Sequence, residues 1–318
     1  MATIIPLSDI LTVLETIDVI VAMEQGFVQY SNGQAVVPPV GELLFDHPKG
    51  EAHIKYGYIK QTDYYCIKIA SGFYDNPKFG IASSQGLMLL FSQLTGEPKA
   101  ILLDEGKLTD VRTAAAGALV AQYFAPKDIK AIGILGTGTQ ARLQLQYLQK
   151  VTPCRKVWVW GRNRTNAQQF KTEMEGELEI NIAESPTEVA QHCNLIVTTT
   201  PAETPLLQAS DILPGTHITA VGSDTSTKQE LASDLLGKAD LLIADSIAQS
   251  QSRGEIYRAT SDGEVDASRV VELGAAIQNE NLQRINDEQI SIADLTGVAV
   301  QDIMISQAVY INYLNKEV

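Results

Sequence analysis

The chain has 318 residues, of which 45% are hydrophobic and 19% charged, and its formal net charge is −14. Its length favours two domains, and the composition supplies ample material for a buried core. The acidic balance disfavours nucleic acid and anionic membranes as partners, so an anionic ligand must be collected by a local basic pocket.

The N-terminus carries no basic region followed by an uninterrupted apolar run, so no signal peptide is expected. The three cysteines, Cys66, Cys154 and Cys193, are widely spaced and odd in number, which suggests a reducing cytosol. The four histidines form no H-x-x-x-H pair, so no metal site is expected. These features predict a cytoplasmic protein.

Residues 8–31 have apolar positions at helical spacing and predict one amphipathic helix. Short alternating runs separated by turn residues then predict a mostly antiparallel sheet, with strands at 42–45, 53–59, 64–70, 87–91 and 100–103. Thr109 to Phe124 is rich in alanine and predicts a strong helix capped by Thr109 and ended before Pro126.

From Lys130 onward strands and helices alternate, which is typical of a doubly wound parallel sheet. The expected strands are 132–135, 156–160, 195–198, 217–220 and 241–244. The expected helices are 140–150, 165–174, 185–191 and 228–236, with a last helix at 303–315 returning to the first domain. The predicted fold class is α/β, with a Rossmann-type domain at 116–294 and an α+β substrate and dimerisation domain at 1–115 with 295–318.

The most informative motif is Gly136-Thr-Gly-Thr-Gln-Ala141, which lies between a predicted strand and a predicted helix. In that context Gly136 makes a tight turn, Gly138 lets the backbone approach phosphate oxygens, and Ala141 lets the helix pack close to its strand. The motif therefore predicts a dinucleotide site, although a plain strand-to-helix turn has the same pattern.

The second strand of this domain is followed by Gly161-Arg-Asn-Arg164, where an NAD site usually has an acid. Guanidinium groups suit a 2′-phosphate, because their planar fork makes bidentate, charge-assisted contacts. Arg162, Asn163 and Arg164 therefore favour NADPH, with NADH possible, unless the two arginines only begin a solvated helix.

Three basic residues of the first domain are candidates for binding an acidic substrate. Arg112 is the first arginine of the chain and has small apolar neighbours, but it could instead pair with Asp104, Glu105 or Asp110. Lys68 and Lys55 each lie on a predicted strand, where a lysine can equally be a solvated position.

Further candidates follow later strands of the second domain. Asp224 comes just after a predicted strand, where it could exchange a proton with an amine or imine nitrogen, or else cap a helix at 226–236. The segment from Thr198 through Thr199 to Thr200 follows the preceding strand and is placed to touch the cofactor.

With these motifs in this order, the chain resembles the ornithine cyclodeaminase/mu-crystallin family over nearly its whole length. The resemblance rests on Lys68 before Gly72-Phe-Tyr-Asp-Asn76, on Leu108-Thr-Asp-Val-Arg-Thr-Ala114, on the glycine motif, and on Val221-Gly-Ser-Asp224 with Lys228-Gln-Glu230. It implies a homodimer in which each subunit pairs a nicotinamide-binding Rossmann domain with a sheet domain that dimerises.

The resemblance also implies roles for individual residues. Lys68 and Arg112 would bind the substrate carboxylate, with Lys55 and Ser84 as further candidates, and Asp224 with Lys68 would act in catalysis. The residues expected to bind the cofactor are Gly136, Thr137, Gly138, Thr139, Gln140, Ala141, Arg162, Asn163, Arg164, Thr198, Thr199, Thr200, Val221 and Gly222.

Family members differ in chemistry, and two departures argue against ornithine cyclodeamination here. That subgroup has an acid after the second Rossmann strand and an arginine in the N-terminal strands, and this chain has neither. The expected function is therefore NAD(P)H-dependent reduction of a small cyclic ketimine acid, foremost Δ1-pyrroline-2-carboxylate to L-proline in proline metabolism. The alternatives are an ornithine cyclodeaminase, with Asp75, Asp294 or Asp302 as the extra acid, or a non-catalytic cofactor binder of the mu-crystallin type.

Overall fold

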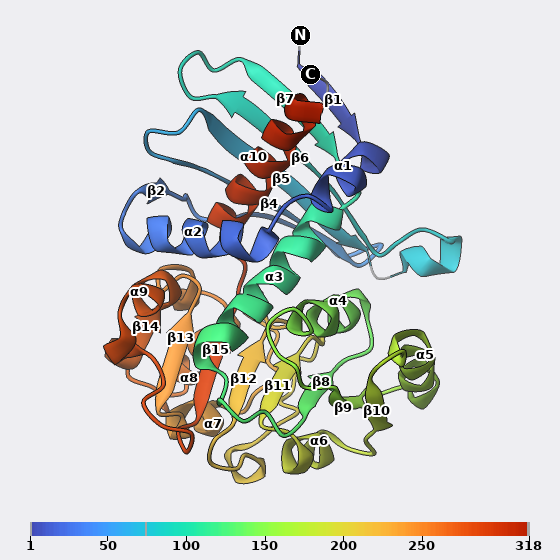
Figure 1. Cartoon of the computed structure of the whole chain (residues 1–318), viewed down its shortest axis with the longest axis vertical. Helices are drawn as coiled ribbons and strands as arrows, with labels where there is room; N and C mark the ends of the chain where they lie inside the picture. Colours follow the sequence, from blue (N-terminus) through green and yellow to red (C-terminus); the bar gives the residue numbers. More distant parts are fainter. Residues whose placement is uncertain (1, 74, 317–318) are drawn as a thin grey trace. The chain divides into compact units, whose positions relative to one another are not determined.

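Two structural units make up the computed structural model, which describes residues 2–73 and 75–316 (Figure 1). Unit 1 comprises Met1–Arg112 with Val298–Val318, and unit 2 comprises Thr113–Gly297. The division falls inside helix α3 (Lys107–Phe124), so that one helix contributes to both units. The domain limits expected from the sequence lie within a few residues of these positions.

Unit 1 is built on a seven-stranded sheet with the order β1-β7-β6-β5-β4-β2, and β3 also pairs with β4. Its strands are β1 (Thr3–Pro6), β2 (Ala35–Val36), β3 (Gly41–Phe45), β4 (Gly50–Ile59), β5 (Tyr64–Phe73), β6 (Ser84–Ser92) and β7 (Pro98–Leu103). Only β1 and β7 are parallel, which confirms the prediction of a mostly antiparallel sheet.

One face of this sheet is covered by helix α10 (Ala299–Lys316), which contacts β4, β5 and β6. Helices α1 (Leu7–Leu14) and α2 (Val19–Ser31) pack against α10 in turn. The prediction of one helix over 8–31 was wrong, because Asp18 starts a new helix by accepting a hydrogen bond from the Val21 N–H at 3.2 Å.

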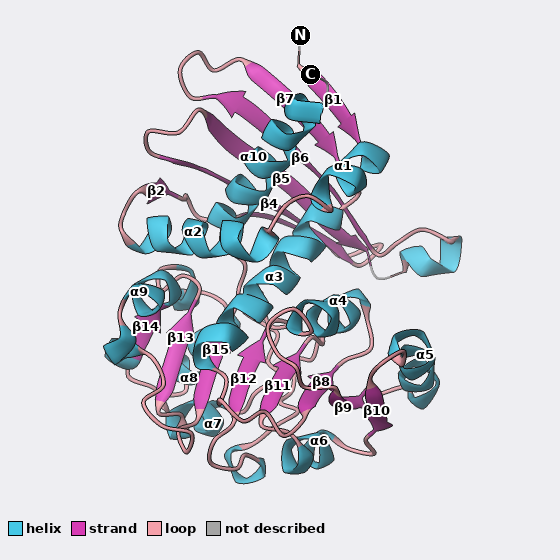
Figure 2. Ribbon diagram, in the orientation of Figure 1, coloured by secondary structure: helices cyan, strands magenta, loops and turns pink. Residues whose placement is uncertain are grey.

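Unit 2 contains an eight-stranded, entirely parallel sheet with the order β10-β9-β8-β11-β12-β15-β13-β14 (Figure 2). Its strands are β8 (Ile132–Leu135), β9 (Lys156–Trp160), β10 (Glu179–Ile182), β11 (Leu195–Thr198), β12 (His217–Ala220), β13 (Leu241–Ala244), β14 (Val270–Glu272) and β15 (Ser291–Asp294). All residues of β8, β11, β12 and β15 are buried, as expected for parallel strands with both faces covered. The doubly wound prediction is confirmed.

Helices connect most of these strands. They are α4 (Thr139–Leu148), α5 (Arg164–Met174), α6 (Pro186–His192), α7 (Ser233–Lys238), α8 (Gly254–Ser261) and α9 (Leu273–Gln278). Short 3₁₀ helices occur at η1 (Asn76–Phe79), η2 (Ala209–Asp211), η3 (Gln249–Gln251), η4 (Ala267–Arg269) and η5 (Glu280–Leu282).

Three helix starts differ from the sequence-based expectation. Helix α10 begins at Ala299 rather than at residue 303. Helix α3 begins at Lys107, and the Asp104 carboxylate accepts from the Leu108 N–H at 2.8 Å, so that Thr109 lies inside the helix. The helix expected from residue 228 begins only at Ser233, because the N–H groups of Glu230 and Leu231 donate to Glu255 of α8. In this last case a tertiary contact overrides local propensity.

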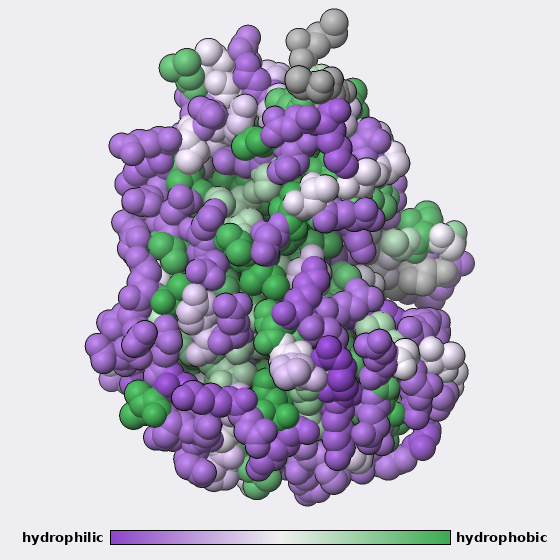
Figure 3. All heavy atoms as spheres, viewed as in Figure 1, coloured by the Kyte–Doolittle hydropathy of each residue, from purple (hydrophilic) through white to green (hydrophobic). Residues whose placement is uncertain are grey.

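The visible surface is largely hydrophilic, with scattered apolar patches (Figure 3). Within the described residues, no helix is both long and apolar enough to cross a membrane. Cys66, Cys154 and Cys193 are free thiols, and Cys66 and Cys193 are buried.

Candidate functional site

A glycine turn follows β8 and lines a pocket of unit 2. Gly136 has φ +122°, and a Cβ there would lie 2.3 Å from Thr199 Oγ1, so no other residue fits this turn. A Cβ on Gly138 would meet nothing within 4 Å, which leaves the backbone of that residue open. Helix α4 begins immediately afterwards, so its N-terminal N–H groups lie beside the turn.

The pocket beside this turn has a volume of about 550 Å³. It is lined by residues that follow β8, β9 and β11, namely Gly136, Thr137, Gly138, Trp160, Gly161, Arg162, Asn163, Asn166, Thr199, Thr200, Pro201, Ala202, Glu203, Thr204 and Leu206. Strand β8 lies between β9 and β11, so the strand order reverses here. Ligands of open parallel sheets bind at this kind of switch point, at the carboxyl ends of the strands.

Arg142 of α4 contacts both the glycine turn and helix α5. Its guanidinium donates to the carbonyl oxygens of Thr137 and Gly138, pairs with Glu173 at 2.6 Å, and lies 5.3 Å from the centre of the Phe170 ring. These contacts tie the turn to helix α5 and hold its backbone in place for a ligand.

The three polar residues after β9 have different surroundings. Arg162 is exposed and lines the pocket. Asn163 also lines it, but its side chain caps α5 by accepting from the Thr165 and Asn166 N–H groups at 2.8 and 3.3 Å. Arg164 is paired with Glu184 and does not line the pocket. Arg162 is therefore the arginine that the pocket presents to a ligand.

The remaining residues expected to bind the cofactor also differ in whether they line the pocket. Thr137, Thr199 and Thr200 line the pocket, whereas Thr198 is fully buried and donates its hydroxyl to Glu230. Thr139, Gln140 and Ala141 form the first turn of α4, and Val221 and Gly222 follow β12. Sequence reasoning did not single out Trp160, Asn166 or the residues from Ala202 to Thr204 as cofactor contacts, because none carries a motif.

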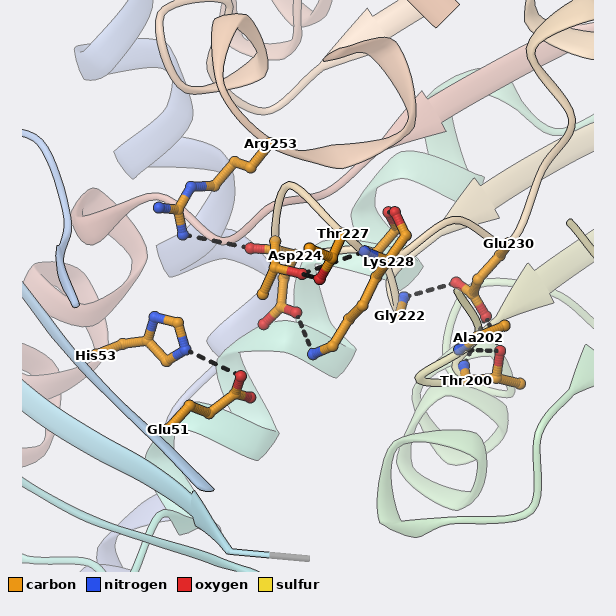
Figure 4. Close-up of polar contacts among 12 residues, drawn as sticks. Glu51, His53, Thr200, Ala202, Gly222, Asp224, Thr227, Lys228, Glu230 and Arg253 are labelled. Carbon is orange, nitrogen blue, oxygen red and sulfur yellow. Dashed lines mark hydrogen bonds and ion pairs between the residues drawn. The ribbon is translucent and has the colours of Figure 1, made fainter. Parts of the chain in front are cut away.

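Asp224 lies on the loop after β12, and its side chain is 40% exposed (Figure 4). Its carboxylate pairs with the Lys228 ammonium at 2.7 Å, and its backbone carbonyl accepts from Arg253 at 3.3 Å. No helix starts at 226, so the capping alternative is wrong. The Lys228 partner was also missed, since four residues of irregular loop give no signal of such a contact.

Buried carboxyl groups lie beneath the loops of unit 2. Glu230, Glu255 and Asp294 are each at most 1% exposed. Burial raises the pKa of Glu230 to about 7 and that of Asp294 to about 8, and it raises the pKa of Glu255 well above its usual range. These groups therefore retain protons in the folded protein at pH values where they are ionised in an unfolded chain.

Unit 1 contains a second candidate site on the sheet face that α10 covers. Lys55 on β4 and Lys68 on β5 are directly opposite each other in the strand register, so they share this face, and both are buried. Like charges placed opposite each other in a sheet are destabilising unless anions accompany them. The face is therefore suited to hold carboxylates.

One such carboxylate belongs to the protein. Asp302 of α10 is 1% exposed and pairs with Lys68 Nζ at 3.0 Å and with Arg112 Nε at 3.3 Å. Arg112 also donates to Gln301 Oε1 at 2.9 Å. The structure pairs Arg112 with a residue of a helix some 190 positions later in the chain, a partner that the structural alternative did not name.

The ionisation of Lys68 depends on its charged neighbours. Burial lowers the pKa of Lys68, and the nearby Arg112 lowers it further, while the Asp302 carboxylate opposes both effects. Asp104 is also close enough to interact with Lys68, and burial raises its pKa. Lys68 therefore lies among charged groups of both signs.

Other residues of the same face extend the polar surface. His53 lies two residues before Lys55, with its ring nitrogens 3.3 Å from Glu42 and 3.7 Å from Glu51 (Figure 4). Ser84 is exposed and lies on this face too, opposite Gly72. Tyr74, within the motif after β5, lies outside the described residues.

The parallel sheet and its glycine pocket define unit 2 as a Rossmann-type domain. The whole chain, from residue 4 to 317, matches the model of the ornithine cyclodeaminase/mu-crystallin family. The chain belongs to that family, which confirms the resemblance seen in its motifs.

Three similar proteins illustrate the range of the family. An uncharacterized cyclodeaminase of Sinorhizobium fredii is 38% identical over 294 residues, covering 91% of this chain and 89% of the relative. A solved archaeal alanine dehydrogenase dimer with bound NAD has a TM-score of 0.91 at 31% identity, covering 100% and 97% of the two chains. The Δ1-pyrroline-2-carboxylate reductase of Thermococcus litoralis, solved with NADH and L-proline, has a TM-score of 0.92 at 28% identity, covering 99% and 98%.

The raised carboxyl pKa values predict how stability depends on pH. Because the folded protein binds more protons at Glu230, Glu255 and Asp294 than the unfolded chain, its stability falls as pH rises from about 5 to about 8.5. Thermal unfolding across this range checks it. Asp294→Asn, which mimics the neutral acid, should flatten the dependence.

A matched control is Asp266→Asn, since Asp266 is exposed and hydrogen bonds lower its pKa below this range. That variant should keep the wild-type slope. A slope in Asp294→Asn as steep as that of the wild type would contradict the prediction.

Proposed function

We propose that this protein is an NAD(P)H-dependent reductase of a small cyclic ketimine carboxylate, foremost Δ1-pyrroline-2-carboxylate, which it converts to L-proline. The observation that carries the proposal is the buried basic face of unit 1, where Lys55 opposes Lys68 and Asp302 joins Lys68 to Arg112. The Thermococcus litoralis relative, a reductase solved with NADH and L-proline, supports this choice of substrate.

In the proposed reaction the basic face binds the substrate carboxylate. Lys68 and Arg112 make the direct contacts, with Lys55 adding positive charge, and Asp302 holds the two cationic groups in fixed positions. Because these side chains are already desolvated and oriented, little further ordering is required on binding. Fixing the substrate in this way contributes to rate mainly through positioning.

The pocket of unit 2 would hold the dinucleotide, with the open backbone at Gly138 and the first turn of α4 toward the phosphates. When bound, the nicotinamide supplies the hydride that reduces the C=N carbon. Asp224 would relay a proton from solvent to the ring nitrogen, and the Lys228 ammonium would orient its carboxylate. Arg162 lines the pocket and would bind the 2′-phosphate, which favours NADPH over NADH.

Ornithine cyclodeamination is the less favoured alternative. It needs a further acid for the second amino group of ornithine, and all three candidates already have partners. Asp75 pairs with Lys78 at 2.7 Å. Asp302 pairs with Lys68 and Arg112, while Asp294 is buried and accepts from the Ile256 N–H at 2.9 Å. This use of the three acids favours the ketimine reductase.

The test is an absorbance assay at 340 nm with Δ1-pyrroline-2-carboxylate and NADPH or NADH, run beside ornithine plus NAD with ammonia detection. Oxidation of reduced cofactor by the imine is the expected result. Ammonia from ornithine together with a silent imine reaction would replace the proposal by cyclodeamination.

Replacement of Arg112 tests the basic face. Arg112→Ala should raise the KM for the imine by roughly 10- to 100-fold and lower kcat, because a hydrogen-bonded ion pair with the substrate carboxylate is lost. Arg155→Ala removes an exposed arginine that contacts only backbone carbonyls among its recorded partners and should leave both constants unchanged. Equal KM values in the two variants would rule out the assigned role.

Cofactor preference depends on Arg162. Arg162→Ala should lower kcat/KM for NADPH by roughly 10- to 100-fold and change that for NADH little, because only NADPH carries the 2′-phosphate. Arg164→Ala should have a smaller effect, since Arg164 is paired with Glu184. If Arg162→Ala lowers kcat/KM equally for NADPH and NADH, the arginine does not bind this phosphate.

We also propose a homodimer formed through the sheet face of unit 1 opposite to Lys68. Alternation along the strands places Ile4, Tyr56, Tyr58, Ile69 and Leu103 on that face, and all five are exposed apolar side chains. Such a contiguous patch is typical of a protein–protein interface. The archaeal relative, solved as a dimer, supports this assignment.

Ile69→Asp should weaken the dimer, because it places a charge within the apolar face. Light scattering after gel filtration should show a shift toward monomer at low protein concentration. Leu94→Asp is the matched control, since Leu94 is 92% exposed in the turn after β6 and should leave the mass unchanged. A dimer of unaltered affinity in Ile69→Asp would exclude this face.

A further inference from the structure

Glu230 is a buried carboxylate that joins the loops after β11 and β12 of unit 2, and no step of the proposed reaction uses it. Its Oε1 accepts hydrogen bonds from the N–H and the hydroxyl of Thr200, at 2.6 and 2.8 Å. Its Oε2 accepts from the Thr198 hydroxyl at 2.7 Å. The same oxygen accepts from the Gly222 N–H at 2.8 Å, a contact drawn in Figure 4. The side chain is 0% exposed.

The backbone around Glu230 is tied to the same loops. Its carbonyl accepts from the Leu206 N–H at 2.7 Å, and the Gln229 N–H donates to the Ala202 carbonyl at 2.7 Å. Its own N–H donates to Glu255 Oε1 of α8 at 2.6 Å. The residue is therefore anchored from behind and holds the loop after β11 at both its beginning and its end.

That loop forms one wall of the glycine pocket. Residues 199–204 and Leu206 line the pocket but belong to no helix or strand. Their positions consequently depend on hydrogen bonds and packing contacts such as those to Glu230, rather than on regular secondary structure.

The packing around Glu230 leaves little freedom for the loops to shift. A Cβ on Gly222 would lie 2.2 Å from the Thr200 carbonyl oxygen and 2.6 Å from Glu230 Oε2. The loops after β11 and β12 therefore meet at a glycine, and the carboxylate of Glu230 lies at that meeting point.

We propose that Glu230 is a positioning residue that sets the conformation of the 199–206 wall, and through it the affinity for dinucleotide, without contacting the cofactor. The inference rests on the proposed dinucleotide function of this pocket. Thr200, Gly222 and Thr198 transmit the effect, because their donors converge on the two oxygens of one carboxylate.

Above its raised pKa of about 7 Glu230 is ionised, and the test is run at such a pH. The geometry of its contacts then requires a carboxylate and excludes its amide. Each oxygen accepts from one backbone N–H, that of Thr200 on Oε1 and that of Gly222 on Oε2. A glutamine in either orientation would direct its NH₂ group at one of these N–H donors, which leaves a buried donor without an acceptor. Glu230→Gln therefore disrupts these hydrogen bonds while keeping the size and shape of the side chain.

The test compares Glu230→Gln and Thr198→Val with wild type and with a matched control. Thr198→Val removes one donor to Glu230 from a side chain that does not line the pocket. Thr187→Val removes a similar hydroxyl-to-carboxylate bond, to Asp211 at 3.1 Å, that serves no pocket loop. Trp160 lines the pocket, so quenching of tryptophan fluorescence by NADPH and NADH reports the Kd.

Glu230→Gln should raise the Kd for both dinucleotides at least tenfold, and Thr198→Val should raise it roughly three- to tenfold. The KM for the imine, measured at saturating cofactor, should stay within threefold of the wild-type value, because the basic face belongs to unit 1. Thr187→Val should match wild type. If Glu230 only stabilised the fold, Glu230→Gln would lower the fraction of active protein. The cofactor Kd of the remaining folded protein would then not rise while the imine KM stays unchanged.

A folded Glu230→Gln variant with wild-type Kd would overturn the inference. If Glu230→Gln does not fold, the test rests on Thr198→Val. A Kd of Thr198→Val equal to that of Thr187→Val would then overturn the inference. Wild-type protein that binds neither dinucleotide would refute the proposed function itself, which is a distinct result because it requires no variant.

Discussion

The pairing of Asp302 with Lys68 and Arg112 is the interaction on which unit 1 depends. It joins strand β5, the start of α3 and the C-terminal helix α10, three elements far apart in the sequence. Burying ions is costly, and a buried pair that loses one member is destabilised by about 3–5 kcal/mol. The arrangement keeps two desolvated cations in fixed positions beside the same carboxylate, as the proposed binding of a substrate carboxylate requires.

In unit 2, the side chains of Arg142 and Glu230 hold the loops that line the pocket. The pocket walls are loops, and loops without secondary structure must be fixed by other contacts. Arg142 braces the glycine turn from α4, while Glu230 braces the wall after β11. Each charged group acts on backbone atoms, so that the surface presented to a ligand is shaped by residues that lie behind it.

The sequence predicted much of the architecture because the relevant signals are local. The strands from β4 to β7 and five of the eight strands in the parallel sheet follow from apolar runs bounded by turn residues. Strand β15 was missed because Ser291-Ile-Ala-Asp294 has no such run, although it is a fully buried central strand. Helix α7 was placed too early because Lys228 and Glu230 look helical in sequence, whereas the Glu230 N–H donates to the distant Glu255.

Residue type and spacing along the chain are enough to predict the glycine turn, the alternation of strands and helices, and the family. The pairing of charged side chains depends on the tertiary structure. The tertiary structure paired Arg112 with Asp302, Asp224 with Lys228 and Arg164 with Glu184, and it converged the loops after β11 and β12 on Glu230. The physical reason is that an ion pair or hydrogen bond depends on a few ångströms of separation in space, which the distance between two residues in sequence does not specify.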